Sequence, residues 1–407
     1  MLRFEEALER ILALADPPMP EETVVLDDAE GRVLAESLVA TADLPAFDYS
    51  AMDGYAVASK DVSAAAVLPL RGESRTGVVP DPLVPGSTMR IFTGAELPAG
   101  ADAVVMQEHV ETAGDGVVFA SAARVGQHVR PRGNDLAKGA TALEHGTRLG
   151  PAHVALAAAL DRSDLVVARR PSVAILATGD ELRRPGTDTL PGTIPESNTV
   201  ALRAMAKRAG ATTRAYPFVR DDRQATERAF ASALEEVDVL VTIGGVSVGD
   251  HDLVRPALEA VGVHLDFWRV AIKPGKPLAV GVKLREGRRR STIVLGLPGN
   301  PASAIITFAL FGLPLLRAMQ GDTHPFPRFQ RARMTKAHAH DPGRLELARA
   351  QVTQADEGLL VTTLGNQASG AITSMAQADA LVCIPEHVNG VAAGEEVDIL
   401  TMADLLG

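Results

Sequence analysis

The segment Val239-Leu-Val-Thr-Ile-Gly-Gly-Val-Ser-Val-Gly-Asp-His-Asp252 joins an apolar run to a glycine-rich loop and two carboxylates. The run over residues 237–243 is rich in β-branched side chains, as expected of a strand buried on both faces of a parallel sheet. Gly244, Gly245 and Gly249 let the backbone turn tightly and approach a ligand closely. Because open α/β sheets bind ligands at the carboxyl ends of their strands, we expect chemistry in this loop.

Length and composition narrow the class of protein. The chain has 407 residues, too many for one ordinary core, so two to four domains are expected. A hydrophobic content of 46% and a charged content of 22% are typical of a soluble globular protein. The net charge of −11 and the aromatic content of 4% argue against a nucleic-acid partner, although a few local cations can still bind a small anion.

No segment predicts export or membrane insertion. The apolar runs are interrupted before they reach the length of a membrane span, and residues 1–15 read as an amphipathic helix, not a signal peptide. Cys383 is the single cysteine, which excludes an internal disulfide and a thiolate cluster. We therefore expect a cytoplasmic protein with no membrane partner.

The chain divides into three parts, which predicts a multidomain α/β plus β fold. Residues 1–168 are expected to form an elongated N-terminal part that is helical at its ends, with a β-rich insert at roughly residues 50–140. Residues 169–322 alternate strand and helix, which predicts a doubly wound, mostly parallel sheet with helices on both faces. Residues 328–407 return to short alternating segments, typical of a small β-barrel-like domain.

Periodicity places the individual elements. Besides the N-terminal helix, a helix is expected around residues 151–160. In the α/β part we expect, in order, a strand at 172–177, a helix at 197–208, a strand at 212–219, a helix at 222–235, a strand at 237–243, a helix at 253–260, strands at 263–270, 278–282 and 292–295, and a helix at 301–319.

Two adjacent carboxylates follow the first α/β strand, in Thr178-Gly-Asp-Glu181. Mg²⁺ prefers oxygen ligands and binds substrate phosphates, so Asp180 and Glu181 are candidate metal ligands, with Thr178 and Gly179 as substrate contacts. In the alternative interpretation Asp180 caps a helix and Glu181 is solvated.

The loop after strand 237–243 carries a hydroxyl and amides that can cradle a phosphate, at Gly244, Gly245, Ser247 and Gly249. Asp250 and Asp252 follow and can share the metal or orient a substrate amine. Ordinary turns use the same residues, but the position directly after a buried strand favours a binding loop.

Two more loops of the α/β part suit an anion. Pro298, Gly299 and Asn300 precede a helix, where they serve ordinary capping and also offer amides to an anion. Lys273 and Lys276 stand in a stiff proline-containing turn and form a candidate clamp for a phosphate or another oxyanion. The alternative is a pair of exposed lysines without a specific role.

Polar loops of the N-terminal part add three candidate oxygen ligands: Asp53, Thr93 and Asp135. Asp53 precedes a glycine and can equally serve only a turn. The residues alone leave the roles of all three open.

Together, seven segments resemble the molybdenum insertase family (MoeA type), the molybdopterin molybdenumtransferases, to which the catalytic half of gephyrin also belongs. The resemblance spans nearly the whole chain. It rests on Phe47-Asp-Tyr-Ser-Ala-Met-Asp-Gly-Tyr-Ala-Val57, Ile91-Phe-Thr-Gly-Ala95, Ala177-Thr-Gly-Asp-Glu-Leu182, Glu196-Ser-Asn198, Gly244-Gly-Val-Ser-Val-Gly-Asp250, Ala271-Ile-Lys-Pro-Gly-Lys-Pro277 and Leu297-Pro-Gly-Asn-Pro-Ala-Ser303.

The resemblance implies a four-part, elongated subunit that forms a homodimer, in which the partner's N-terminal domains complete the pterin cleft. The implied reaction transfers molybdate to adenylylated molybdopterin with Mg²⁺ and releases AMP; the adenylyltransferase of the same pathway is a possible partner. Positions implied to be catalytic are Asp53, Thr93, Asp135, Glu181, Asp252, Lys273 and Lys276. Implied substrate-binding positions, beyond the loop residues above, are Ser197, Asp221, Arg269, Arg344 and Ser369.

The sequence departs from the family pattern at several positions. Arg269 stands where a lysine is common, Ala368 where a glycine is usual and Asp379 where asparagine is frequent. Two other functions remain open: adenylyl transfer to molybdopterin by an enzyme that shares the α/β fold but is usually a single domain, and a non-catalytic dimeric scaffold. The intact carboxylates and the two lysines argue against the scaffold.

Overall fold

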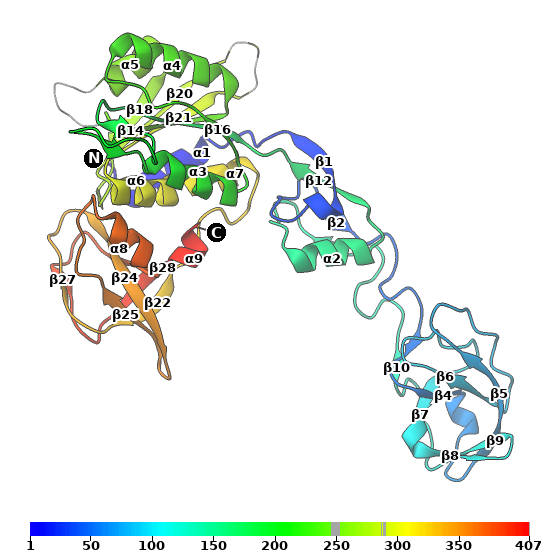
Figure 1. Ribbon diagram of the computed structural model, residues 1–407. Helices are drawn as coiled ribbons and strands as arrows, with labels where there is room; N and C mark the ends of the chain where they lie inside the picture. The colour runs from blue at the N-terminus through cyan, green and yellow to red at the C-terminus, as the bar shows by residue number, and fades with distance from the viewer. Residues whose placement is uncertain (246–252, 286, 288–289, 407) are drawn as a thin grey trace.

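The protein is an elongated chain of separate compact parts, seen in a computed structural model that describes residues 1–245, 253–285, 287 and 290–406. The α/β domain and the C-terminal domain lie side by side (Figure 1). A small domain with β1, β12 and α2 extends away from them, and a β-rich insert lies at the far end.

The α/β domain is built on a six-stranded sheet in the order β16-β13-β17-β21-β20-β18. The first four strands are mutually parallel, whereas β20 runs antiparallel to both of its neighbours. The strand bounds are Ser172–Ala177 for β13, Thr212–Ala215 for β16, Val239–Ile243 for β17, His264–Arg269 for β18, Pro277–Lys283 for β20 and Thr292–Leu297 for β21. Strand β16 is shorter than expected because Pro217 has no N–H to continue the ladder.

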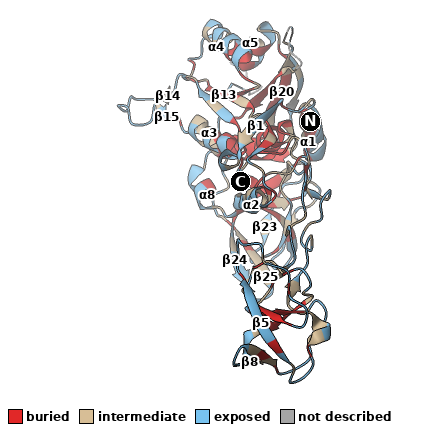
Figure 2. Cartoon of the chain, turned by 90° about the vertical axis from the view of Figure 1, so that its right-hand side faces the viewer, coloured by how far each residue is buried: buried red, intermediate tan, exposed pale blue. Residues whose placement is uncertain are grey.

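Helices cover both faces of this sheet, as the buried strands predict. Val173, Ile175 and Ala177 of β13 pack into one cluster, whereas Ala174 and Leu176 face the other. The first face is covered by α1 (Phe4–Ala13), α3 (Asn198–Arg208), α6 (Pro301–Thr307) and α7 (Leu313–Met319), and the second by α4 (Arg223–Glu236) and α5 (Val254–Ala260). Figure 2 shows buried residues concentrated at this sheet and its covering helices.

Helix α1 packs on the α/β domain although it precedes the N-terminal domains in sequence. Phe4, Ala7 and Ile11 are buried against this core, and the Phe4 ring lies 5.6 Å from that of Phe311. An N-terminal helix is therefore confirmed, but its packing partner is a segment about 300 residues away in sequence, which local periodicity does not reveal.

A single helical segment, Pro301–Met319, runs through the core with a π-helical stretch, Phe308–Gly312. It is 19 residues long with a mean hydropathy of 1.7, which is long and apolar enough to cross a membrane by composition. The expectation that every apolar run stops short of that length is therefore wrong for this segment. However, 89% of the segment's apolar window is buried inside the protein, as in a core helix.

The C-terminal domain is a closed barrel. Its strands are paired in the order β24-β25-β22-β28-β26, and β26 pairs again with β24 to close the ring. The bounds are Gln330–Met334 for β22, Leu345–Ala355 for β24, Gly358–Thr363 for β25, Ala380–Ile384 for β26 and Glu396–Thr401 for β28. Closure leaves no free edge among these strands, and the predicted barrel-like domain is confirmed.

The N-terminal part contains two units. In the first, β1 (Glu21–Val25) pairs with β12 (Asp164–Ala168) beside α2 (Pro151–Ala159). The second is the β-rich insert, a six-stranded sheet in the order β7-β4-β6-β5-β9-β8. Its strands are β4 (Gly54–Val57), β5 (Val67–Ser74), β6 (Thr88–Ile91), β7 (Ala103–Met106), β8 (Val110–Ala113) and β9 (Gly116–Phe119).

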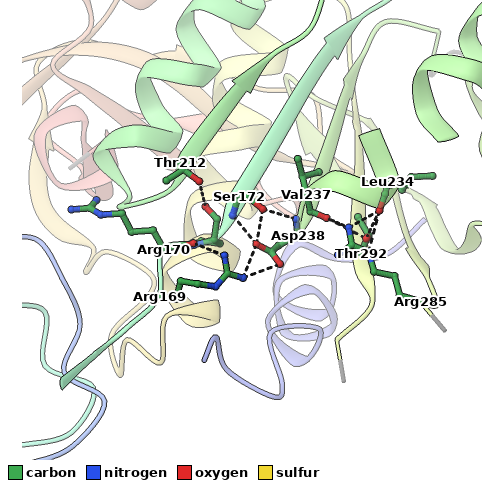
Figure 3. Close-up of polar contacts among 10 residues, drawn as sticks. Arg169, Arg170, Ser172, Thr212, Leu234, Val237, Asp238, Arg285 and Thr292 are labelled. Atoms are coloured by element: carbon green, nitrogen blue, oxygen red, sulfur yellow. Dashed lines mark hydrogen bonds and ion pairs between the residues drawn. The ribbon is translucent and has the colours of Figure 1, made fainter. Parts of the chain in front are cut away.

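Polar contacts fasten the amino-terminal edge of the α/β sheet (Figure 3). Asp238 accepts hydrogen bonds from Ser172 N at 2.8 Å and Ser172 Oγ at 2.7 Å, and Arg169 Nη2 lies 3.2 Å away. Burial alone would raise the pKa of Asp238, but the bonds from Ser172 and the charge of Arg169 outweigh it and lower the pKa. This anchor leaves the opposite, carboxyl edge of the sheet free for a site.

Candidate functional site

Two adjoining pockets of about 350 and 400 Å³ lie at the carboxyl ends of β13, β17 and β21. Thr178, Glu181, Gly244, Gly299 and Asn300 line both. The first pocket also contacts Ser197, whereas the second contacts Gly179, Asp221, Gly245 and Pro298. The structure therefore brings together residues from all three described loops at the expected edge of the sheet.

Backbone hydrogen bonds hold these loops in register. Thr178 N donates to Ile243 O at 3.0 Å, and Gly244 N donates to Leu297 O at 3.1 Å. Gly244 has φ +88°, and a Cβ there would lie 2.9 Å from Thr178 O. Gly245 has φ +61°, and a Cβ there would lie 2.5 Å from Val254 Cγ2. Glycine at 244 therefore lets the β17 loop approach the β13 loop, and glycine at 245 lets it approach α5.

Asn198 is a pocket residue that the candidate set omits. Its Nδ2 donates to Gly299 O at 2.7 Å, and in the described chain its Oδ1 is buried without a hydrogen-bond partner. Asn198 also begins α3, and the Thr199 amide in this first turn already donates to the Glu196 carboxylate at 2.8 Å. The Glu196-Ser-Asn198 motif at the start of this helix could have identified Asn198 from the sequence.

The described acidic residues fit a hard cation only in part. Asp180, Glu181 and Asp221 are exposed, and of these Glu181 and Asp221 line the pockets, whereas Asp180 lines neither. The amide of Asp221 donates to Asp180 Oδ1 at 3.3 Å. A Cβ at Gly179 would lie 2.4 Å from Glu181 Oε2, so glycine makes room for that carboxylate. Across the described ranges, no group of three potential metal ligands is present. Ser247, Gly249, Asp250 and Asp252 lie outside the described residues.

The barrel contributes to the same edge through Ser369. Asn300 Nδ2 donates to Ser369 Oγ at 2.9 Å, and Ala302 N donates to Ser369 O at 3.0 Å. Arg344 is half-buried immediately before β24, and the amide of Leu345 donates to Ala271 O at 2.9 Å. Both barrel candidates therefore lie at the joint with the α/β domain.

The two lysines do not line either pocket. Lys273 Nζ points to the barrel and lies 3.2 Å from Glu346 Oε1. Lys276 and Arg269 are exposed. Glu346 is a further residue that motif reasoning missed, because nothing in its local pattern distinguishes it from another strand residue.

The N-terminal candidates form a separate group. Thr93 donates to Asp53 Oδ1 through its amide at 2.7 Å and through its hydroxyl at 2.8 Å, and these bonds lower the pKa of Asp53. Asp135 is exposed in a loop whose amides donate to Leu44 O. The insert that holds Asp53 and Thr93 lies far from the α/β domain of the same chain (Figure 1). One chain alone therefore does not bring these residues to the pockets.

A larger hollow of about 1110 Å³ lies elsewhere, where residues 144–148, the 322–330 segment and α9 (Met402–Leu406) meet. None of the candidate residues that the structure describes lines it. We place the site at the two smaller pockets because they combine glycine loops and carboxylates.

Family models match three successive parts of the chain. The MoeA N-terminal region (domains I and II) matches residues 2–160, a probable molybdopterin binding domain matches residues 174–318, and the MoeA C-terminal region (domain IV) matches residues 331–402. The molybdopterin molybdenumtransferase of Haemophilus influenzae is 33% identical over 412 residues, covering 100% of both chains. Molybdopterin molybdenumtransferase 2 of Mycobacterium tuberculosis is 36% identical, covering 93% of this chain and 94% of that one.

Solved structures give the same result. A crystal structure of the molybdopterin biosynthesis MoeA protein from Pyrococcus horikoshii has a TM-score of 0.82 at 31% identity, covering 98% of this chain and 99% of that one. A crystal structure of a molybdopterin biosynthesis MoeA protein from Pyrococcus horikoshii OT3 has a TM-score of 0.85 at 28% identity, covering 98% of this chain and 100% of that one.

Proposed function

The chain belongs to the MoeA family, the molybdopterin molybdenumtransferases of molybdenum cofactor biosynthesis, and we propose that it inserts molybdate into adenylylated molybdopterin with release of AMP. The observation that carries the proposal is the meeting of three loops at the adjoining pockets, within a domain that matches a probable molybdopterin binding domain. The pterin and its phosphates would occupy these pockets, beside Thr178, Asn198 and Asn300.

The proposed chemistry needs positioned donors more than a protein nucleophile. A molybdate oxygen attacks the phosphorus of the AMP moiety, and the bond from that phosphorus to the oxygen of the pterin phosphate breaks. The dithiolene thiols bind molybdenum and lose their protons, the bond between molybdenum and the transferred oxygen breaks, and AMP leaves with that oxygen. If a water that molybdate directs attacks instead, AMP leaves with the water oxygen, and the thiol protons leave with one molybdate oxygen as water. The amide of Gly245, which lines the second pocket, stabilises the negative charge that develops. Lys273 and Lys276 attract the oxyanion from the joint with the barrel.

Mg²⁺ is the proposed metal, with Asp180 and Glu181 as its described oxygen ligands and Asp250 and Asp252 as further candidates. When bound, it would neutralise phosphate charge near the cleavage point. The exposed carboxylate of Glu181, which the absence of a Cβ at Gly179 accommodates, fits an oxygen-liganded cation that keeps several waters.

The proposed enzyme acts as a homodimer in the cytoplasm. Asp53 and Thr93 already contact each other in the insert, yet they lie far from the pockets of their own chain. A second copy of the chain could bring this pair, with Asp135, to the pocket mouth. The adenylyltransferase that supplies the substrate is a further proposed partner.

Reconstitution tests the proposal. The purified protein, Mg²⁺, molybdate and adenylylated molybdopterin are combined, and molybdenum cofactor is measured by activation of an apo-molybdoenzyme. Activation that needs all four components is expected. Formation of adenylylated molybdopterin from ATP and free molybdopterin would instead assign the preceding step, and binding without either conversion would indicate a scaffold.

A further inference from the structure

The barrel and the lysine loop of the α/β domain share a short strand pair. Strand β19 (Ile272–Lys273) pairs in parallel with β24, and the register sets Lys273 opposite Glu346. The amide of Leu345 donates to Ala271 O at 2.9 Å and extends this pairing. The backbone therefore fixes which barrel residue faces the lysine.

The two side chains form an ion pair that is buried at only one end. Lys273 Nζ lies 3.2 Å from Glu346 Oε1, and the side chains are 35% and 4% exposed, respectively. Burial would raise the pKa of Glu346, but contacts from His338, His340 and Lys273 outweigh it and lower the pKa to about 2. Glu346 is therefore a fixed, charged carboxylate, and the Lys273 ammonium remains reachable from solvent.

One histidine of the barrel, His340, holds this carboxylate, and a second, His338, lies beside it. His340 Nδ1 lies 2.6 Å from Glu346 Oε2, and because an ionised carboxylate only accepts, the imidazole donates. His338 Nε2 lies 3.6 Å from Glu346 Oε1, too far for a hydrogen bond, while its Nδ1 contacts Thr363 Oγ1 at 3.2 Å. Within the described chain, the Nε2 atoms of both rings are buried without hydrogen-bond partners.

A role in joining the two domains does not account for this cluster. A buried ion pair adds little stability over a well-packed apolar pair, because desolvation offsets the attraction. The two buried imidazole nitrogens add a further cost. The cluster does orient the lysine. Glu346 holds one of the three N–H donors of the Lys273 ammonium, which leaves two for another acceptor.

We propose that Glu346 is a positioning residue that orients Lys273 toward an incoming oxyanion, and that His340 fixes the Glu346 carboxylate for this purpose. The barrel thereby sets the geometry of a lysine that belongs to the α/β domain. The inference deepens the proposed function and rests on it for the identity of the oxyanion, molybdate. The contact between Glu346 and Lys273 does not depend on that identity.

Nitrogen-15 NMR relaxation of the lysine side chains in the full-length protein tests the contact without any activity. A carboxylate that holds the ammonium restricts its motion, so Glu346→Gln should lower the order parameter of the Lys273 side-chain nitrogen. Lys207, an exposed lysine of α3, is the reference whose order parameter should not change. An unchanged order parameter at Lys273 would overturn the positioning role, whether or not the protein has the proposed activity.

Steady-state kinetics tests whether the orientation serves the reaction. Glu346→Gln should raise KM for molybdate about tenfold, because one charge-assisted contact to molybdate is lost. The affinity for adenylylated molybdopterin should change little. In a Lys273→Met background the same substitution should have no further effect, since Glu346 acts through Lys273. Equal effects in both backgrounds would contradict the proposal.

His340 provides the second variant pair. In His340→Asn the amide nitrogen lies near the position of Nδ1 and can still donate to Glu346, whereas His340→Ala removes the donor. The order parameter of the Lys273 side-chain nitrogen should therefore be lower in the alanine variant than in the asparagine variant, with thermal unfolding as the check on folding. Equal order parameters in the two variants would exclude His340 from the positioning role.

Discussion

At the scale of single residues, Glu181 is the described carboxylate that best separates catalysis from binding. It lines both pockets, is exposed, and follows a glycine whose missing Cβ leaves room for its carboxylate. Glu181→Gln keeps the shape but removes the charge that would hold Mg²⁺. Turnover should fall about 100-fold or more, the usual effect of losing one group that stabilises charge in the transition state. The affinity for the pterin should change little.

The matched control is Glu235→Gln, an exposed glutamate of α4 on the second face of the sheet. It should leave both turnover and binding unchanged. Calorimetric titration with adenylylated molybdopterin and single-turnover AMP release separate the two effects. Full AMP release by Glu181→Gln would remove the carboxylate from the proposed mechanism.

Asp238 gives a prediction about acid stability. Its folded pKa lies below the ordinary value of 3.8, so its contribution is fully present above pH 3.8 and is lost as the pH falls through the folded pKa. Asp238→Asn should lower the free energy of unfolding by about 1–2 kcal/mol at neutral pH, because charge-assisted bonds from Ser172 and Arg169 are weakened. Thermal unfolding across this pH range should show the gap between the two proteins narrowing only below pH 3.8. A gap that widens on acidification would contradict the assigned pKa direction.

Residue roles could be predicted from the sequence only where a motif carried them. Thr178, Glu181 and Asn300 follow predicted strands, and the structure brings them to the same pockets. Glu346 could not be predicted, because its meeting with Lys273 depends on a strand pair between segments that are distant in sequence. Its buried histidine contacts likewise appear only once the barrel has closed.

At the scale of elements, the approach of the β13 and β17 loops depends on glycine. Gly244→Ala would force a Cβ to 2.9 Å from Thr178 O at φ +88°. Gly186→Ala is the matched control, because φ is +81° there but nothing lies within 4 Å. Both variants should lose about 1–2 kcal/mol from backbone strain, but only Gly244→Ala should also weaken pterin binding. Equal binding by the two variants would show that the loop approach does not shape the site.

The elements themselves were largely predictable, since each carries its own periodicity. Strands β13, β17 and β21 and helices α3 and α4 lie within about two residues of their predicted positions. The packing of α1 and the antiparallel direction of β20 were not predictable, because both depend on contacts between separate elements. The π-helical stretch at Phe308–Gly312 also has no local signature.

At the scale of the whole molecule, the distance between the insert and the pockets predicts complementation between subunits. A mixture of Asp53→Asn and Glu181→Gln chains should form heterodimers in which one of two sites is intact. If subunits exchange freely, activity should reach about a quarter of the wild-type value, although each variant alone is inactive. Activity of the mixture no higher than that of the separate variants would argue against sites shared between chains.

Domain architecture was visible in the sequence as shifts in composition and pattern. The alternation of strands and helices in the central part predicted the doubly wound sheet, and the short segments near the C-terminus predicted a barrel. The large distance between the insert and the pockets of the same chain was not predictable, because the angle between domains is set by few residues at each junction. This distance is the structural reason to test for a site shared between subunits.

The most direct test of the central claim is AMP release from adenylylated molybdopterin, measured with and without molybdate and Mg²⁺. Insertion predicts that AMP appears only when both are present, in a one-to-one ratio with molybdenum cofactor. AMP release that does not depend on molybdate would contradict the proposed function. So would adenylylated pterin that remains unreacted when molybdate and Mg²⁺ are both present.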